Sequence, residues 1–231
     1  MKYLLESHRN GLFLFENDPV FNEDWKSVLE VLDSISDEDL ITAHESARQR
    51  RPSCKSLSDA INGLLRERLD AQRWEPESAI FSDPEYTRRN ETRWRLDFAS
   101  DVMAVEVAFN HGEAIAWNLL KPVLSAELNH VAKARQTRAG VLVTATEAMK
   151  QAGNFDGAVG TFEKFKRYLD PMMNVLTVPM VIVGLQAPES FCVGHSGGIK
   201  GQVVRLQSSR TGSASVLLAA EDSSEYGEYI D

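Results

Sequence analysis

Two apolar segments that alternate like β-strands, residues 95–99 and 102–109, are separated by only two polar residues. Successive strand side chains point to opposite faces, so two such segments joined by so short a connection predict a β-hairpin. Each segment carries one acidic residue, Asp97 in the first and Glu106 in the second. Carboxylates are rarely buried unless something positive meets them. The hairpin therefore predicts two carboxylates that face each other across neighbouring strands.

After the hairpin, helix and strand patterns alternate. The expected elements are a helical region over residues 115–131 with Pro122 as a kink or break, a strand over 140–144, a helix over 162–172 and a strand over 178–185. This order predicts an α/β protein with a mixed central β-sheet flanked by helices.

The segment before the hairpin has a more helical character. Residues 25–32 have helical spacing, whereas residues 12–15 are expected to form a short strand. Residues 36–55 are polar and basic and are expected to be a mobile or ligand-ordered loop. Ser56 is expected to cap a helix that runs to about Gln72.

The composition excludes some classes of protein. The chain has 231 residues, of which 43% are hydrophobic, enough for one sizeable core. No apolar run approaches the length of a membrane span, and the start of the chain lacks the layout of a signal peptide. Cys54 and Cys192 are far apart and show no metal-ligand spacing. We therefore expect a reduced cytoplasmic protein rather than a membrane or disulfide-built one.

The formal charge of -9 argues against general affinity for nucleic acids, but its distribution does not. Residues 1–47 carry 3 basic and 11 acidic side chains, residues 48–220 carry 22 basic and 18 acidic, and residues 221–231 carry 5 acidic and no basic. Local potential, not total charge, decides whether a polyanion can dock, and the middle of the chain is mildly basic. Acidic ends that only keep the protein soluble are the simpler explanation of the same pattern.

The acidic hairpin has a chemical interpretation and a structural one. Strand alternation places Ala104, Glu106 and Ala108 on one face, with Asp97 able to face Glu106 from the preceding strand. Two carboxylates and the backbone carbonyl of Val107 can hold Mg²⁺, which prefers few protein ligands plus waters and phosphate oxygens. Such an ion can activate water and stabilise the leaving oxygen in phosphodiester cleavage. Alternatively, the carboxylates pair with neighbouring arginines and serve only the fold.

Several motifs, in a shared order, resemble the BglII and BstYI group of restriction endonucleases. The stretch Leu96-Asp97-Phe98, then eight residues between Asp97 and Glu106, then Glu106-Val107-x-Phe109 looks like the catalytic hairpin of that group. The other similar segments are Ser7-His8-x-Asn10-Gly11-Leu12, residues 57–74, Ser125-x-Glu127-Leu128-x-His130 and residues 178–185. The resemblance covers most of residues 7–188. It implies a restriction-endonuclease-like core of the PD-(D/E)xK superfamily and a type II site-specific deoxyribonuclease.

The resemblance also implies the roles of individual residues. Asp97 and Glu106 would be metal ligands, and Val107 would contribute its carbonyl. The third position of the family carries Gln, Glu or Lys, which helps to hold or activate the attacking water, but here it is Ala108. Three explanations stay open: an inactivated form, a binder that has lost its chemistry, or another residue in the role. The last is favoured, with Lys121 and His111 as the nearest polar candidates.

One further acidic residue is expected near the metal. Glu77 lies three residues after Trp74, where related enzymes place an accessory polar or acidic group, and Glu75 is equally close in sequence. An ordinary exposed glutamate would give the same pattern.

Three basic clusters flank the acidic pair. They are Arg88, Arg89, Arg93 and Arg95; Lys133, Arg135 and Arg138; and Lys164, Lys166 and Arg167. Arginine suits phosphate clamping and guanine reading, although each cluster alone is typical of a solvated helix face. Asn110 and His111 follow the second strand, where relatives contact bases, and residues 48–51 could wrap DNA from a loop.

The resemblance implies a homodimer with twofold symmetry that cuts both strands of a palindromic site in double-stranded DNA. The helix with Leu119, Leu124, Leu128 and Val131 could supply a four-helix interface, or could pack on its own sheet. The expected cofactor is Mg²⁺, with Mn²⁺ as a possible substitute and Ca²⁺ as a non-cleaving one. A cognate DNA methyltransferase is the expected genetic partner, and no membrane is expected. Alternatives are a structure-specific or repair nuclease, or a catalytically decayed DNA-binding protein on the same fold.

The expected domain organisation is simple. Residues 1–190 would form a single nuclease domain, with an N-terminal helical part at about 20–75 and a catalytic α/β core at about 93–188. Residues 191–231 would be a C-terminal extension with an acidic tail and a possible hairpin that pairs 202–206 with 215–219.

Overall fold

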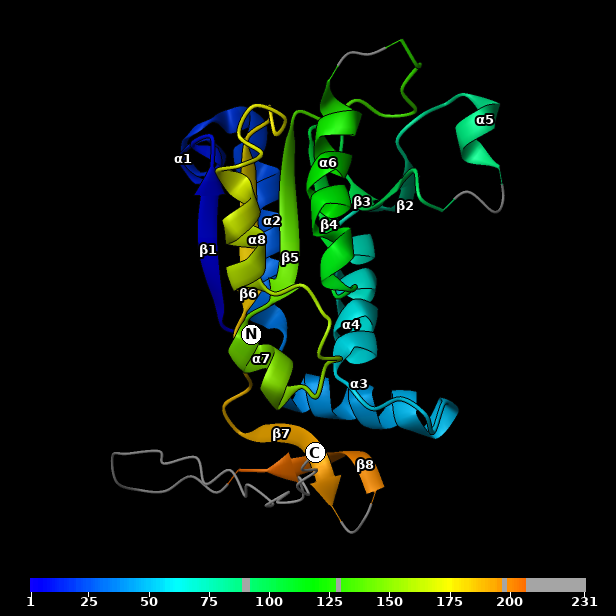
Figure 1. Ribbon diagram of the computed structural model, residues 1–231, viewed down its shortest axis with the longest axis vertical. Coiled ribbons are helices and arrows are strands. Elements are labelled where there is room, and N and C mark those ends of the chain that lie inside the picture. The colour runs from blue at the N-terminus through cyan, green and yellow to red at the C-terminus, as the bar shows by residue number, and fades with distance from the viewer. Residues whose placement is uncertain (89–91, 128–129, 197–198, 207–231) are drawn as a thin grey trace, which may run out of the picture.

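The computed structural model describes residues 1–88, 92–127, 130–196 and 199–206 (Figure 1). A six-stranded sheet has the order β1-β6-β5-β4-β3-β2, and a separate two-stranded sheet pairs β7 with β8. The strands are β1 (Tyr3–His8), β2 (Glu75–Ala79), β3 (Arg95–Ala99), β4 (Met103–Val107), β5 (Ala139–Ala145), β6 (Met180–Leu185), β7 (Phe191–Ser196) and β8 (Ile199–Arg205). The central strands β4, β5 and β6 are parallel, whereas β1, β3 and β2 pair antiparallel at the edges. The predicted mixed sheet is confirmed.

Helices cover both faces of this sheet. They are α1 (Gly11–Asn17), α2 (Pro19–Ser34), α3 (Asp37–Arg50), α4 (Ser58–Ala71), α5 (Pro84–Thr87), the short 3-10 helix η1 (Gly112–Ala114), α6 (Ile115–Ala126), α7 (Glu147–Ala152) and α8 (Phe162–Leu169). Helices α2 and α4 share one hydrophobic cluster with the sheet, and α6 and α8 share another. The sheet is therefore the middle of three layers (Figure 1).

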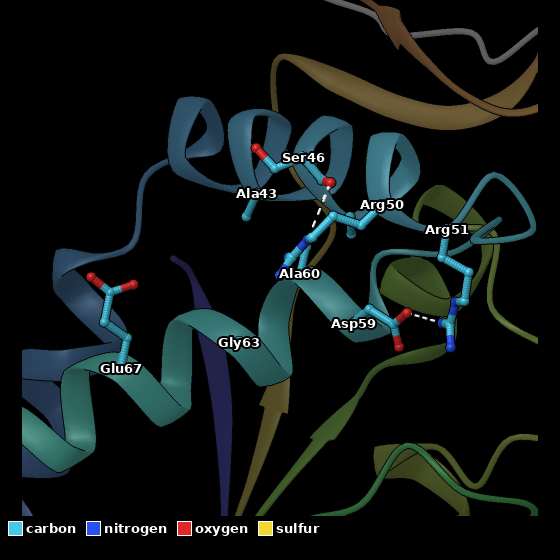
Figure 2. Close-up of a pocket in the computed structure, with 9 residues that line it drawn as sticks. Ala43, Ser46, Arg50, Arg51, Asp59, Ala60, Gly63 and Glu67 are labelled. Atoms are coloured by element: carbon cyan, nitrogen blue, oxygen red, sulfur yellow. Dashed lines mark hydrogen bonds and ion pairs between the residues drawn. The ribbon is translucent and has the colours of Figure 1, made fainter.

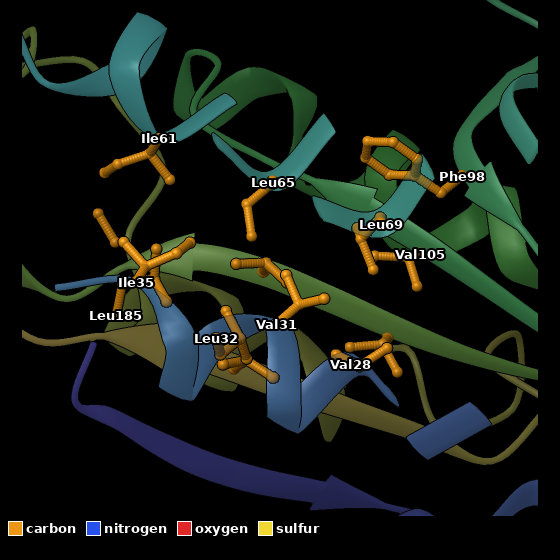
Figure 3. Close-up of a cluster of buried hydrophobic side chains, with 14 of the residues drawn as sticks. Val28, Val31, Leu32, Ile35, Ile61, Leu65, Leu69, Phe98, Val105 and Leu185 are labelled. Carbon is orange, nitrogen blue, oxygen red and sulfur yellow. The ribbon is translucent and has the colours of Figure 1, made fainter. Parts of the chain in front are cut away.

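The α2/α4 layer shows why these segments are helices. Asp18 caps the N-terminus of α2 and Pro19 starts it, which suits the first helical turn. Its apolar residues recur every three or four positions and meet those of α4 above the sheet (Figure 3). The residues labelled in Figure 3 are Val28, Val31 and Leu32 from α2, Ile35 directly after it, Ile61, Leu65 and Leu69 from α4, and Phe98, Val105 and Leu185 from the sheet. This packing supports β3 and β4 on the face of the sheet that α2 and α4 cover.

The hairpin predicted around Ser100 is confirmed by the pairing of β3 with β4. The hydroxyl oxygen of Ser100 accepts the backbone N–H groups of Val102 at 3.2 Å and Met103 at 2.9 Å. It also donates to the carboxylate of Asp24 on α2. These bonds fix the turn to the helical layer, and so they fix how the two acidic strands face each other.

Two expectations about the N-terminal half were wrong. Residues 12–15 lie in α1 rather than in a strand, because four apolar residues in a row have no period of their own. Residues 36–55 are not a loop, since most of them form α3. Ser36 and Asp39 make a reciprocal capping box at the start of α3, which stabilises a helix despite its polar composition.

Other boundaries differ as well. Ser56 does not cap α4, whose N-cap position is Leu57. The helix expected over 115–131 ends at Ala126. Strand β8 pairs with β7, while the partner expected for it, residues 215–219, lies outside the described residues.

The β7–β8 hairpin docks on α3 (Figure 1). The Asp37 carboxylate accepts the backbone N–H of Ser190 at 2.9 Å, and buried His44 meets the carbonyl of Gly201 at 2.9 Å. Arg205 also pairs with Glu38. Within the described ranges, no helix is both long enough and apolar enough to span a membrane.

Candidate active site

Asp97 and Glu106 lie where the ladder between β3 and β4 ends. The last paired residues before them are Phe98 and Val105. Beyond that pair, each carboxylate accepts a backbone N–H of the other strand: Asp97 N donates to Glu106 Oε1 at 3.3 Å, and Val107 N donates to Asp97 Oδ2 at 2.7 Å. The side chains thus satisfy donors that the ladder leaves unpaired. The prediction that these two carboxylates come together is confirmed.

The environment of this pair opposes its ionisation. Glu106 is only 1% exposed. Burial, and then the charge of Asp97, raise the pKa of the Glu106 carboxyl to about 8, although Lys121 opposes the shift. Burial also raises the pKa of Asp97, against the hydrogen bond from Val107. A buried and a half-buried carboxylate, both with raised pKa values, form a site whose negative charge is undercompensated.

Lys121 is the side-chain cation that contacts this pair. Its Nζ lies 2.6 Å from Oε2 of Glu106, and its side chain is 12% exposed. Lys121 comes from α6, on the opposite sheet face from α4. Of the two substitutes considered for the third position, Lys121 therefore reaches Glu106, whereas His111 is exposed at the start of η1.

Ala108 continues past the end of β4. Its backbone N–H donates to the carbonyl of Val143 at 2.8 Å, and its own carbonyl accepts the hydroxyl of Thr144 at 3.0 Å. Its methyl group is buried in the cluster that also holds Leu119 and Phe165. Ala108 is therefore a packed part of the sheet that has no group to donate or accept a proton.

A cavity of about 230 Å³ opens beside Asp97 on the α4 side. Its lining residues are Asn62, Arg66, Glu77, Asp97, Phe98 and Val107. Glu77 has a φ of 51°, a left-handed conformation that is uncommon outside glycine. Its carboxylate pairs with Arg66 at 2.5 Å, and its charge contributes to the raised pKa of Asp97. Glu77 therefore lines the same cavity as Asp97, and its role as an accessory group stays a prediction.

The donor set suits a hard divalent cation. Carboxylate and carbonyl oxygens are the ligands that Mg²⁺ prefers, and Asp97, Glu106 and Val107 bring such groups together. A cation there would also favour the charged form of both carboxyl groups, whose pKa values are raised first of all by burial. Within the described ranges, no group of three or more His, Cys, Asp or Glu side chains converges on one point. The predicted ligand set has only two such side chains, Asp97 and Glu106, because its third ligand is a backbone carbonyl.

Residues 3–185 match the family described as restriction endonuclease BglII/BglIII. The chain belongs to the BglII/BglIII restriction endonuclease family. It is accordingly a type II site-specific deoxyribonuclease by class. A search of curated proteins found no match.

The fold agrees with the family. The crystal structure of restriction endonuclease BglII complexed with a DNA 16-mer matches with a TM-score of 0.59 and 14% identity, covering 89% of this chain and 88% of that one. The free BglII structure matches with a TM-score of 0.48 and 14% identity, covering 84% of each chain. The restriction-endonuclease-like core is therefore confirmed. Strands β7 and β8 follow the last residue of the family match.

A larger cavity, about 450 Å³, lies between α3 and α4 (Figure 2). Its lining includes Arg50 and Arg51, two of the basic residues that were expected to wrap DNA from a loop. They lie instead on the last turn of α3 and just after it. Arg50 donates to the carbonyl of Ser46 at 3.4 Å, and Arg51 pairs with Asp59 (Figure 2). None of the residues predicted to be catalytic lines this cavity. The candidate active site is therefore the smaller cavity beside Asp97, whose lining includes two carboxylates.

The basic residues expected to contact DNA differ in their availability. Arg135 pairs with Glu75 and Asp101, and Lys133 donates to a backbone carbonyl and lies 4.6 Å from the ring centroid of Phe81. These two side chains are therefore engaged within the chain.

Of the first cluster, Arg88 and Arg93 are exposed, Arg95 donates to the Glu77 carbonyl at 3.2 Å, and Arg89 lies outside the described residues. In the second cluster, Arg138 is exposed. In the third cluster, Lys166 pairs with Glu6.

Asn110 and His111 are exposed beyond the end of β4. The carbonyl of Asn110 accepts the backbone N–H of Gly160 at 2.9 Å, and His111 bridges to Val159. Both candidate base readers are thus fixed by backbone contacts that leave their side chains exposed.

Two cavity residues were missed from the sequence. Asn62 and Arg66 lie one turn apart on α4 and face the cavity beside Asp97. The available signal was this i, i+4 polar spacing on the exposed flank next to Ile61 and Leu65. Sequence alone could not show that this face meets β2 and β3.

Proposed function

We propose that this chain uses Mg²⁺ to hydrolyse phosphodiester bonds at a palindromic site in double-stranded DNA, as the nuclease of a restriction-modification system. Mn²⁺ would substitute, and Ca²⁺ would support binding without cleavage. The observation that carries the proposal is the pair of half-buried Asp97 and buried Glu106, each hydrogen-bonded to the backbone of the other strand where β3 and β4 stop pairing. Family membership supplies the class of reaction.

Asp97 and Glu106, with the carbonyl of Val107, would hold the cation. When bound, it would supply Lewis-acid charge to the phosphate and to the attacking water. The chain's own residues position these groups. The Val107 N–H fixes Asp97, and Lys121 fixes Glu106, so neither carboxylate is free to rotate. Glu77, whose carboxylate pairs with Arg66, would act as an accessory group at the cavity wall.

Exposed cations and polar groups around the hairpin would bind the DNA. Arg88, Arg93 and Arg138 would contact phosphates, and Asn110 and His111 would contact bases beyond β4. The BglII structure that shares this fold is complexed with a DNA 16-mer, which supports this assignment. The engaged side chains of Lys133 and Arg135 would contribute only if their present contacts broke.

A twofold homodimer would let one active site cut each strand of a palindrome. Helix α6 would contribute the interface through its partly buried residues, which include Leu120 and Leu124. Leu119 would not, because it is fully buried against the sheet. A cognate DNA methyltransferase would protect the host genome.

The test is cleavage of a long linear DNA of known sequence. With Mg²⁺ the purified chain should give discrete fragments, and with Ca²⁺ it should bind without cutting. Cutting confined to branched DNA would favour a structure-specific nuclease instead. Binding with no cutting in either Mg²⁺ or Mn²⁺ would favour a decayed nuclease.

A further inference from the structure

Residue 108, two positions after Glu106, carries only a methyl group. Ala108 is 2% exposed and packs among apolar residues of α6 and α8. Nothing at this position can donate a hydrogen bond to a water or to a phosphate oxygen. If the chain cleaves DNA, another residue must supply that donor.

We propose that Lys121 on α6 is the cationic donor of the active site, in place of a side chain at residue 108. The inference rests on the proposed function. The Lys121 ammonium lies 2.6 Å from Glu106 Oε2, and Lys121 is 12% exposed on its side chain. An ammonium carries three N–H donors, so one can hold Glu106 while others meet a phosphate oxygen or the attacking water.

Hydrolysis joins a water oxygen to phosphorus and breaks the bond from phosphorus to one sugar oxygen. The water gives a proton to solvent, the sugar oxygen takes one from solvent, and no electrons are exchanged. Negative charge spreads over the phosphate oxygens as the bonds change. A fixed cationic donor next to Glu106 stabilises that charge without having to reorganise.

The packing beneath α6 explains how a helix can supply this lysine. A Cβ atom at Gly140 on β5 would lie 2.6 Å from Cβ of Pro122, the residue after Lys121. The absence of a side chain at Gly140 therefore lets α6 lie directly against the sheet. Ala104 and Ala108, on either side of Glu106 along β4, are also small. A lysine from α6 thus reaches a carboxylate that a larger neighbour would screen.

His111 is the weaker candidate for this role. It is exposed, and its contacts with the described residues are made by its backbone. A purely structural role for Lys121 is the stronger competitor, because Lys121 neutralises a buried carboxylate from the face opposite to the cavity. The experiment must separate that role from a catalytic one.

Lys121→Met keeps the length of the side chain and removes its charge. Lys150→Met is the matched control, because Lys150 is 15% exposed and pairs with Glu147 on α7, away from the hairpin. We expect Lys121→Met to slow single-turnover cleavage by about 100-fold or more. DNA affinity in Ca²⁺ and thermal stability should match the control. Mn²⁺ affinity of the DNA-free protein, measured by calorimetry, should be unchanged or tighter, because the lysine and the cation repel each other.

Relocating the charge gives a second arm. The double variant Ala108→Lys with Lys121→Ala should recover at least about tenfold of the lost rate, because both residues adjoin Glu106. If this variant does not fold, the Lys121→Met arm decides alone.

Three results would overturn the role of Lys121. They are cleavage by Lys121→Met within about threefold of the parent, loss of Mn²⁺ binding or folding together with cleavage, and a folded double variant that recovers nothing. A parent chain that cuts no DNA in Mg²⁺ or Mn²⁺ is a different outcome, because it overturns the proposed function itself.

Discussion

The Oδ2 atom of Asp97 accepts the backbone N–H of Val107 at 2.7 Å. The carboxylate proposed to bind the cation therefore holds in place the residue whose carbonyl is proposed to join it. This bond exists because the β3–β4 ladder ends one residue earlier, which frees both strands to present polar groups at the same point. The site is thus built into the backbone geometry of the hairpin.

Asp97→Asn keeps an oxygen that can accept the Val107 N–H, but it removes the charge. We expect cleavage to fall by about 1,000-fold or more, since the site loses a cation ligand. Thermal stability should not fall, because the substitution also removes the repulsion between Asp97 and the buried carboxylate of Glu106. Plasmid cleavage and thermal unfolding measure the two effects. Asp70→Asn, an exposed change on α4, is the control and should leave both unchanged.

Glu106 should give the metal-free protein a pH-dependent stability. The pKa of its carboxyl is about 8 in the folded chain, against an ordinary 4.5. Between these values the folded chain holds a proton that the unfolded chain releases. The contribution of Glu106 to the free energy of unfolding is therefore complete below the unfolded pKa, and it is lost as the pH rises to about 8.

Urea unfolding of the parent and Glu106→Gln, with a chelator present, tests this dependence. Relative to the variant, the parent should lose stability from about pH 5 to about pH 8. Affinity of the parent for Ca²⁺ should rise by up to about tenfold per pH unit over the upper part of that range, because the cation needs the charged carboxylate. Parallel stability curves for the two proteins would contradict the raised pKa.

Gly201 should be essential to the docking of the β7–β8 hairpin. Its φ is +77°, and a Cβ atom there would lie 2.7 Å from Cα of Lys55. We expect Gly201→Ala to lower the free energy of unfolding by about 1–3 kcal/mol. Gly194→Ala in the same hairpin is the control, because a Cβ there meets nothing within 4 Å. Equal losses in the two variants, measured by urea unfolding, would refute this account of the hairpin.

Arg93 and Arg135 should differ in their contribution to DNA binding. Arg93 is exposed and forms no ion pair with the described residues, whereas Arg135 already pairs with Glu75 and Asp101. Arg93→Ala should weaken binding in Ca²⁺ and reduce the slope of log affinity against log salt by about 1. Arg135→Ala should leave that slope unchanged. The reverse order in fluorescence-anisotropy titrations would show that DNA binding breaks the ion pairs of Arg135.

The acidic hairpin was predictable because its information is local. The alternation of apolar and polar residues within 95–109 predicted the two strands, and the short turn at Ser100 predicted that they pair with each other. The contact of Lys121 with Glu106 depends on how closely α6 approaches the sheet, which Gly140 permits from a distant part of the chain. The sequence could name Lys121 as a candidate, but it could not choose between Lys121 and His111.

The errors in the N-terminal half have local causes. Helix α3 has a weakly apolar face, so its composition resembles a loop, and its signal was the capping box of Ser36 and Asp39. The role of Arg66 beside Glu77 was not predictable, because it needs α4 and β2 to be placed in space. The wrong expectations therefore arose where polar composition or tertiary packing, rather than apolar periodicity, decides the structure.

The most direct test of the central claim is to sequence the ends of the fragments that the purified chain produces with Mg²⁺. We predict that the ends map to one short sequence that reads the same on both strands, and that Asp97→Asn produces none of these ends. Ends scattered over unrelated sequences, or the same ends produced undiminished by Asp97→Asn, would contradict a site-specific nuclease centred on Asp97 and Glu106.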